Sequence, residues 1–166
     1  VVTLADKYND TLSGEEGYEE LIRIITPWLD DFDSKCGISE AAQDGNLTIL
    51  GTSGTVTTLG ALHLGLKRYD RSRVDGMVID FESITSISHL LASMTCESRA
   101  THPCIGPERA DLVVMGCALL EAVTRRWNVG RLRVADRGIR EGLLLESMTA
   151  DGYVTGIANQ KISAAQ

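Results

Sequence analysis

The fold is decided by the stretch Leu50-Gly51-Thr52-Ser53-Gly54-Thr55-Val56, in which glycine and hydroxyl residues separate two apolar segments. The apolar run at residues 47–50 predicts a short strand, and residues 56–66 predict a helix despite Gly60. A glycine-rich turn between a strand and a helix suits phosphate. The glycines permit close approach and unusual torsions, while the helix start offers unpaired N–H groups and positive dipole charge. We expect Gly51 and Gly54 to allow this approach, and Thr52, Ser53 and Thr55 to add hydroxyl donors.

A plainer interpretation of the same turn stays open, in which Gly51 to Thr55 only close a tight turn and cap the helix. One class of nucleotide site is disfavoured. A P-loop needs a lysine directly after its second glycine, and Thr55 stands at that position.

The segments on either side of this turn alternate between strand and helix patterns. Apolar runs predict further strands at residues 1–5, 77–79 and 132–135, and apolar spacing of three and four residues predicts helices at 13–32, 83–94, 108–127 and 139–148. We expect Ser13 to cap the first helix, Pro27 to kink it, Ser83 or Thr85 to cap the second, and Pro107 to stand in the first turn of the third. Residues 36–46, 67–75 and 95–106 are predicted as loops. Such alternation indicates an α/β domain with a mainly parallel sheet, whose ligands bind at the carboxyl ends of the strands.

A second strand-to-helix turn, residues 136–142, gathers charge. Arg137 and Arg140 are suited to clamping a phosphate, Asp136 to accepting from a hydroxyl or capping the helix, and Gly138 to permitting the turn. The alternative is a solvated surface of salt bridges. Arg99 and Arg109 are further candidates for contact with a polyanion. The sequence nominates no nucleophile, general base or metal ligand.

Composition limits the function classes. The chain has 166 residues and a formal charge of −7, with eleven acidic and three basic residues among the first 46. This size supports one self-sufficient core, and the charge argues against non-specific binding of nucleic acid or anionic lipid. The uncharged stretch 45–66 is too rich in glycine and hydroxyl residues to span a membrane. The cysteines, Cys36, Cys96, Cys104 and Cys117, lack metal-ligand spacing and are interpreted as reduced and structural, which favours a cytoplasmic protein.

The ordered set of motifs resembles the Ppx/GppA phosphatases, the exopolyphosphatases and guanosine pentaphosphate phosphohydrolases. The motifs that carry the resemblance are Gly51-Thr52-Ser53-Gly54-Thr55, Tyr69-Asp70, Val74-Asp75-Gly76, Ile105-Gly106-Pro107-Glu108-Arg109-Ala110-Asp111, and Val134-Ala135-Asp136-Arg137-Gly138-Ile139-Arg140-Glu141-Gly142-Leu143-Leu144. The resemblance covers about residues 1–149.

This resemblance implies an actin, Hsp70 and sugar-kinase type fold, ribonuclease H-like, with two α/β domains around a cleft. Residues 1–149 resemble the second domain, with a mixed sheet that lacks its first strands, and residues 150–166 are expected to form a peripheral tail. Val1 to Ala5 would match the strand that follows the family's glycine-rich acidic loop, and the start at Val1 rather than Met suggests a missing N-terminus. The catalytic glutamate and the ligands of Mg²⁺ are expected outside this chain.

The function implied by the resemblance is removal of a terminal phosphate from inorganic polyphosphate or guanosine pentaphosphate, with this chain as one wall of the cleft. Phosphate would contact Gly51 to Thr55, Asp136, Arg137, Gly138 and Arg140. The chain's own first domain is the expected partner, homodimerisation is possible, and the isolated chain should be inactive. Two alternatives stay open: the ATP-binding half of a kinase or ATPase with this fold, and a non-enzymatic module that binds an alarmone nucleotide.

Overall fold

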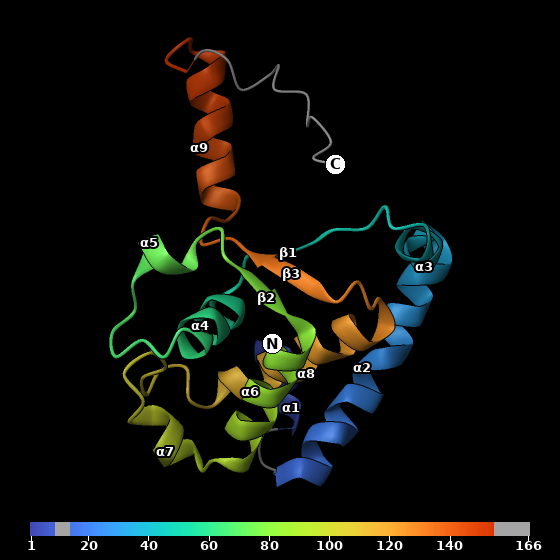
Figure 1. Ribbon diagram of the computed structural model, residues 1–166, viewed down its shortest axis with the longest axis vertical. Coiled ribbons are helices and arrows are strands. Elements are labelled where there is room, and N and C mark those ends of the chain that lie inside the picture. Colours follow the sequence, from blue (N-terminus) through green and yellow to red (C-terminus); the bar gives the residue numbers. More distant parts are fainter. Residues whose placement is uncertain (9–13, 155–166) are drawn as a thin grey trace. The chain divides into compact units, whose positions relative to one another are not determined.

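The computed structural model describes residues 1–8 and 14–154 of the chain. It divides into two compact units, Val1–Asp136 and Arg137–Gln166. In the first unit the elements follow in the order α1 (Val2–Tyr8), α2 (Gly14–Cys36), α3 (Ile38–Gln43), β1 (Ile49–Gly51), α4 (Gly54–His63), α5 (Arg71–Val74), β2 (Val78–Asp80), α6 (Phe81–Ser93), α7 (Cys96–Ala100), α8 (Leu112–Arg126) and β3 (Arg131–Val134) (Figure 1). The second unit contains α9 (Ile139–Ala150). None of the described helices is long and apolar enough to cross a membrane.

The sheet of the first unit is mixed and, within the described residues, has three strands in the order β1-β3-β2. β1 runs parallel to β3, with Gly51 opposite Val134, whereas β2 runs antiparallel to β3, with Asp80 opposite Arg131. The alternation of elements predicted a mainly parallel sheet, and this prediction is wrong for β2, which runs antiparallel. The reason is that two long helices, α6 and α8, connect β2 to β3 and pack against each other. The chain leaves at Asp80 and returns beside it at Arg131.

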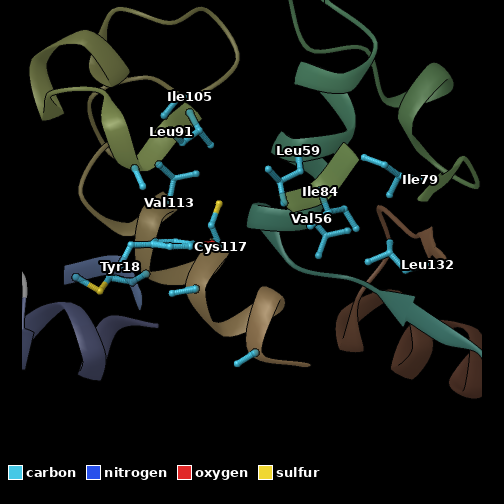
Figure 2. Packing of buried hydrophobic residues seen from close by; sticks show 14 of the residues in the cluster. Tyr18, Val56, Leu59, Ile79, Ile84, Leu91, Ile105, Val113, Cys117 and Leu132 are labelled. Atoms are coloured by element: carbon cyan, nitrogen blue, oxygen red, sulfur yellow. The ribbon is translucent and has the colours of Figure 1, made fainter. Parts of the chain in front are cut away.

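The core of the first unit lies where α2 packs along α8 and where α4 and α6 pack together. Tyr18 of α2 and Cys117 of α8 belong to one part of this core, and Leu59 and Ile84 to the other (Figure 2). Each of these side chains is almost fully buried. Burying an apolar side chain of this size contributes about 1.5–3 kcal/mol, so these interfaces hold α4 and α8, the helices that flank the predicted phosphate turn, in fixed positions.

The start of the chain is the clearest error of the sequence prediction, because residues 1–5 do not form a strand. Residues 2–5 belong to α1, which buries Leu4 and Ala5 and packs on α8. The β-branched residues Val1 and Val2 suggested a strand, but the two apolar positions that matter are consecutive and lie on the helix face toward α8. The predicted cap at Ser13 lies outside the described residues.

Helix boundaries also differ from the sequence prediction. Each of the three predicted loops contains a short helix, α3, α5 or α7. α6 is capped by Asp80, whose side chain accepts from the Ser83 backbone N–H, rather than by Ser83 or Thr85. α8 begins at Leu112, since residues 107–111 form turns, so Pro107 is not in its first turn. Asp111 stands at the N-cap of α8 without capping it, because its carboxylate accepts from the Cys96 thiol at 2.7 Å.

The second unit is described by α9 and the residues beside it. The Gly138 backbone N–H donates to the Glu141 carboxylate at 2.7 Å, which satisfies a donor at the helix start. No residue of α9 is buried, and Leu143 and Leu144 are more than half exposed.

Candidate functional site

The predicted phosphate turn joins β1 to α4, as expected from the sequence. Ser53 is the N-cap of α4, and its hydroxyl accepts from the Val56 backbone N–H at 3.3 Å. The Thr57 backbone N–H donates to the Ser53 carbonyl, which closes the first helical bond at 3.1 Å. Among the described residues, the backbone N–H groups of Gly54 and Thr55 have no acceptor. The helix therefore presents two unpaired donors at its positive end, which is the arrangement that binds anions.

Two glycines from different elements, Gly51 and Gly116, leave room for side chains in the first turn of α4. A Cβ atom at Gly51 would lie 2.7 Å from Cγ1 of Val56, and one at Gly116 of α8 would lie 2.1 Å from Oγ1 of Thr55. Gly51 therefore allows the close approach of Val56 in the following helix, whereas its approach to phosphate stays a prediction. The predicted unusual torsions are wrong, since neither Gly51 nor Gly54 has a positive φ. Gly116 was not identified from the sequence, because nothing in its helical pattern points to the residue that covers it.

The exposed side of this turn opens into a pocket of about 280 Å³ in the first unit. Ser53, Gly54 and Thr55 line one side of it, and Arg109 lines another. The remaining walls are Thr58 and four apolar residues, Val1, Val2, Leu112 and Val113. The structure thus brings together four residues predicted separately, three from the glycine turn and one from the arginine candidates.

Arg109 carries the positive charge of this pocket. Its side chain is exposed and, within the described part of the chain, makes no ion pair or hydrogen bond. Its backbone is fixed, because its carbonyl accepts from the N–H groups of Leu112 at 3.1 Å and Val113 at 2.9 Å. A guanidinium with available donors beside unpaired helix N–H groups suits an anionic oxygen ligand. Thr52 is exposed and does not line this pocket.

Asp136 follows β3 at the edge where β1 also ends, since the Ala135 N–H donates to the Gly51 carbonyl at 2.8 Å. Its carboxylate accepts from the Tyr69 hydroxyl at 2.8 Å and pairs with Arg71 at 3.2 Å, and Arg71 also donates to its carbonyl. Burial and this hydrogen bond raise the pKa of Tyr69 to about 12, so Tyr69 remains a donor at neutral pH. The carboxylate of Asp136 is therefore engaged within the protein.

The other residues predicted from the second turn, Arg137, Gly138 and Arg140, lie in the second unit. All three are exposed. Gly138 has a φ of −125°, which other residues adopt equally well, so the turn does not need glycine for its torsion.

Arg99 has a structural environment. Its Nε donates to the Ala110 carbonyl at 2.8 Å, and its Nη1 donates to the carbonyls of Leu91 at 3.1 Å and Met94 at 2.6 Å. The last two are carbonyls at the end of α6, where a cation is favourable. These bonds join α6 to the turn before α8, and Arg99 does not line the pocket that contains Arg109.

A buried ionic network lies on α2, α6 and α8, and the sequence did not predict it. Glu121 of α8 is fully buried and accepts from Tyr18 at 2.7 Å and from Arg125 at 2.6 Å. Arg125 also binds Glu19 at 2.6 Å, and His89 lies 3.4 Å from Glu121. Ligand atoms of Glu19, His89 and Glu121 lie within 4.8 Å of one another. Arg125 pairs with both carboxylates, so a cation of the protein itself already lies where a metal ion would bind.

Comparisons with known proteins agree with this fold. The model of the Ppx/GppA phosphatase family matches residues 29–151. Exopolyphosphatase 2 of Mycobacterium tuberculosis is 28% identical over 102 residues, which is 59% of this chain and 32% of that protein. The chain therefore spans about a third of the length of the curated relatives it matches.

Solved structures resemble this chain over most of its length. The crystal structure of an exopolyphosphatase-like protein superposes with a TM-score of 0.73 at 26% identity, covering 81% of this chain and 44% of that one. The Aquifex aeolicus member of the Ppx/GppA family superposes with a TM-score of 0.69 at 19% identity, covering 90% of this chain and 48% of that one. With the family model matched over most of its residues, the chain belongs to the Ppx/GppA phosphatase family.

Proposed function

We propose that this chain forms one wall of the phosphate-binding cleft of a phosphohydrolase that removes a terminal phosphate from inorganic polyphosphate or guanosine pentaphosphate. The observation that carries the proposal is the pocket where the unpaired N–H groups of Gly54 and Thr55 lie beside Arg109. The similarity to a mycobacterial exopolyphosphatase supports the same class of substrate.

The proposed chemistry of this wall is charge neutralisation. Phosphoryl transfer depends mainly on positioning and on stabilising negative charge, which helix N–H groups and a guanidinium supply without forming a covalent bond. Gly54 and Thr55 would hold phosphate oxygens through their backbone, and Arg109 would bind the same group or its neighbour along the ligand. Ser53 would orient the helix start and offer its hydroxyl hydrogen.

Mg²⁺, which the family resemblance implies, does not fit the residues of this pocket. The ion prefers several oxygen ligands that include carboxylates, and the residues that line the pocket include none. Asp136, the one acid among the predicted phosphate contacts, is bound by Tyr69 and Arg71. We therefore assign the metal ligands and the general base to protein outside this chain.

The larger architecture belongs to the same proposal. The chain covers under half of the family structures that it resembles, and a cleft of the actin, Hsp70 and sugar-kinase type would place the pocket opposite a second domain. Arg137 and Arg140 remain proposed phosphate contacts from the second strand-to-helix turn, and Arg99 remains a proposed polyanion contact outside the pocket.

Titration calorimetry with polyphosphate and with ATP tests this proposal. We expect polyphosphate to bind the chain more tightly than ATP, Arg109→Ala to weaken binding at least about tenfold, or about 1.4 kcal/mol, and Arg131→Ala, an exposed arginine outside the pocket, to leave it unchanged. Tighter binding of ATP would favour the kinase or ATPase alternative. The chain alone should release no phosphate, and measurable release would contradict the assignment of the base to another part of the protein.

A further inference from the structure

Thr55, in the first turn of α4, lies directly on the backbone of Gly116 in α8. A Cβ atom at Gly116 would lie 2.1 Å from Oγ1 of Thr55 and 2.9 Å from both its Cβ and its Cγ2. Real Cβ atoms essentially never approach other heavy atoms within 3.0 Å. The whole side chain of Thr55 therefore occupies the space that any other residue at position 116 would need.

The two sides of this contact differ in how easily they can move. In α8, the neighbours of Gly116 are Met115, Cys117 and Ala118, and all three are buried at 2% exposure or less. At the start of α4, the N-cap Ser53 and the first residue Gly54 are exposed and face the pocket, whereas residues 56–61 of α4 are buried. A side chain added at Gly116 would therefore displace the start of α4 more readily than it would displace α8, since a packed interior resists rearrangement.

The backbone of Arg109 is bound to α8, the helix that contains Gly116. Its carbonyl accepts from Leu112 and Val113, the first residues of α8. The position of α8 thus fixes the backbone of Arg109, and the contact between Gly116 and Thr55 fixes the start of α4 relative to α8. The contact between Gly116 and Thr55 therefore joins the helix that holds Arg109 to the helix that presents the unpaired N–H groups.

We propose that Gly116 is a positioning residue of the phosphate pocket: its missing side chain lets Thr55 seat on α8 and so sets the spacing between the unpaired N–H groups of α4 and Arg109. This inference rests on the proposed function. It also assigns Thr55 a second role, in which its side chain acts through packing and its backbone N–H binds the anion.

Gly116→Ala tests the inference by calorimetric titration with polyphosphate, with circular dichroism as the check on folding. On helix propensity alone this substitution favours α8, so a loss would come from the contact. We expect the affinity to fall at least about tenfold, which corresponds to about 1.4 kcal/mol. Adding Thr55→Gly to Gly116→Ala removes the overlapping atoms and should restore part of that affinity.

Gly60→Ala is the matched control. Gly60 lies farther along α4, and a Cβ there would lie 3.0 Å from Sδ of Met77 and 3.2 Å from Cγ1 of Val74. This variant also crowds α4 but does not touch Thr55. It should lower the thermal midpoint and leave the affinity for polyphosphate unchanged.

The outcomes separate this inference from the proposed function. If the wild-type chain binds polyphosphate and Gly116→Ala binds equally well, Gly116 has no positioning role and the proposed function stands. If the wild-type chain does not bind, both are overturned.

Should Gly116→Ala not fold, Thr55→Gly decides the question in comparison with Gly60→Ala. Thr55→Gly keeps the backbone N–H that binds the anion but removes the side chain that rests on Gly116, so it should lower the affinity for polyphosphate. An affinity equal to that of Gly60→Ala would overturn the inference.

Discussion

The Tyr18 hydroxyl of α2 donates to Oε2 of Glu121 in α8 at 2.7 Å, across a sequence separation of 103 residues. Both side chains are almost fully buried. Burial, first of all, raises the pKa of Tyr18 far above its usual range, so this hydroxyl keeps its proton at any working pH. The bond anchors α2, the longest described helix, to the helix that supports the phosphate pocket.

Tyr18→Phe should destabilise the protein without changing its apolar packing. The substitution removes one hydrogen bond to a buried carboxylate, and such a bond contributes about 1.5–3 kcal/mol. Urea denaturation measures the loss. Tyr153→Phe is the control, because the Tyr153 side chain is 81% exposed, and it should change stability by less than about 0.5 kcal/mol. Equal effects of the two variants would show that the buried bond contributes nothing.

Two glycines at the turn before α4, Gly51 and Gly54, differ in the space available for a side chain. A Cβ at Gly51 would lie 2.7 and 2.8 Å from the methyl groups of Val56, whereas a Cβ at Gly54 would have nothing within 4 Å. Gly51→Ala should therefore cost about 1–3 kcal/mol through overpacking, and Gly54→Ala should be tolerated. Thermal unfolding of both variants tests this difference. A tolerated Gly51→Ala would mean that Val56 can move aside.

Local patterns in the sequence predicted the elements that surround the site. The strand before Gly51, the glycine turn and the following helix were all predicted, and β2 and β3 fall within two residues of the predicted strands. The apolar spacing predicted α2, whose buried residues include Leu21, Ile22 and Ile25. These features could be predicted because turn chemistry and hydrophobic periodicity act between residues close in sequence.

The contacts between distant segments could not be predicted in the same way. Sequence spacing gave no sign that Thr55 rests on Gly116, that Asp136 is bound by Tyr69 and Arg71, or that Arg99 binds carbonyls at the end of α6. Each depends on how helices pack in three dimensions. The same limit explains the error at α1, where packing against α8 prevailed over the strand preference of Val1 and Val2.

Asp33 should make stability depend on pH in the acid range. Its carboxylate accepts from Ser39, Arg126 and Trp127 at 2.6–3.0 Å. The hydrogen bond from the Ser39 hydroxyl, more than any other contact, holds the pKa of Asp33 below its usual value. The unfolded-state pKa of an aspartate is about 3.9. Because the folded-state pKa of Asp33 is lower, its carboxylate stabilises the folded protein fully at pH values above the unfolded-state pKa. This stabilisation is lost as the pH falls through the folded-state pKa.

Urea midpoints measured at neutral pH and between pH 4 and 2 test this prediction. Asp33→Asn should lower the midpoint at neutral pH and weaken its fall in acid. Asp6→Asn is the control, since the exposed Asp6 side chain has no partner among the described residues, and it should follow the wild-type curve. An Asp33→Asn curve parallel to the wild type would contradict the role of this carboxylate.

The four free cysteines should differ in reactivity. Burial raises the pKa of Cys117 to about 12, and the hydrogen bond to Asp111 raises the pKa of the exposed Cys96. Because the thiolate is the reactive form, iodoacetamide should modify exposed Cys36 first, Cys96 more slowly, and Cys117 only after unfolding. Asp111→Asn should accelerate the modification of Cys96 and leave the rate at Cys36 unchanged, and peptide mass spectrometry measures both rates. An unchanged rate at Cys96 would mean that Asp111 does not control it.

The most direct test of the phosphate pocket is the response of its backbone amides to polyphosphate in ¹⁵N-labelled protein. The N–H groups of Gly54 and Thr55 have no acceptor among the described residues and lie in the pocket with Arg109. Their resonances should shift most strongly and saturably, and Arg109→Ala should weaken the titration without moving the starting peaks of α2. Unchanged Gly54 and Thr55 resonances, with shifts confined to arginines outside the pocket, would contradict the proposed phosphate site.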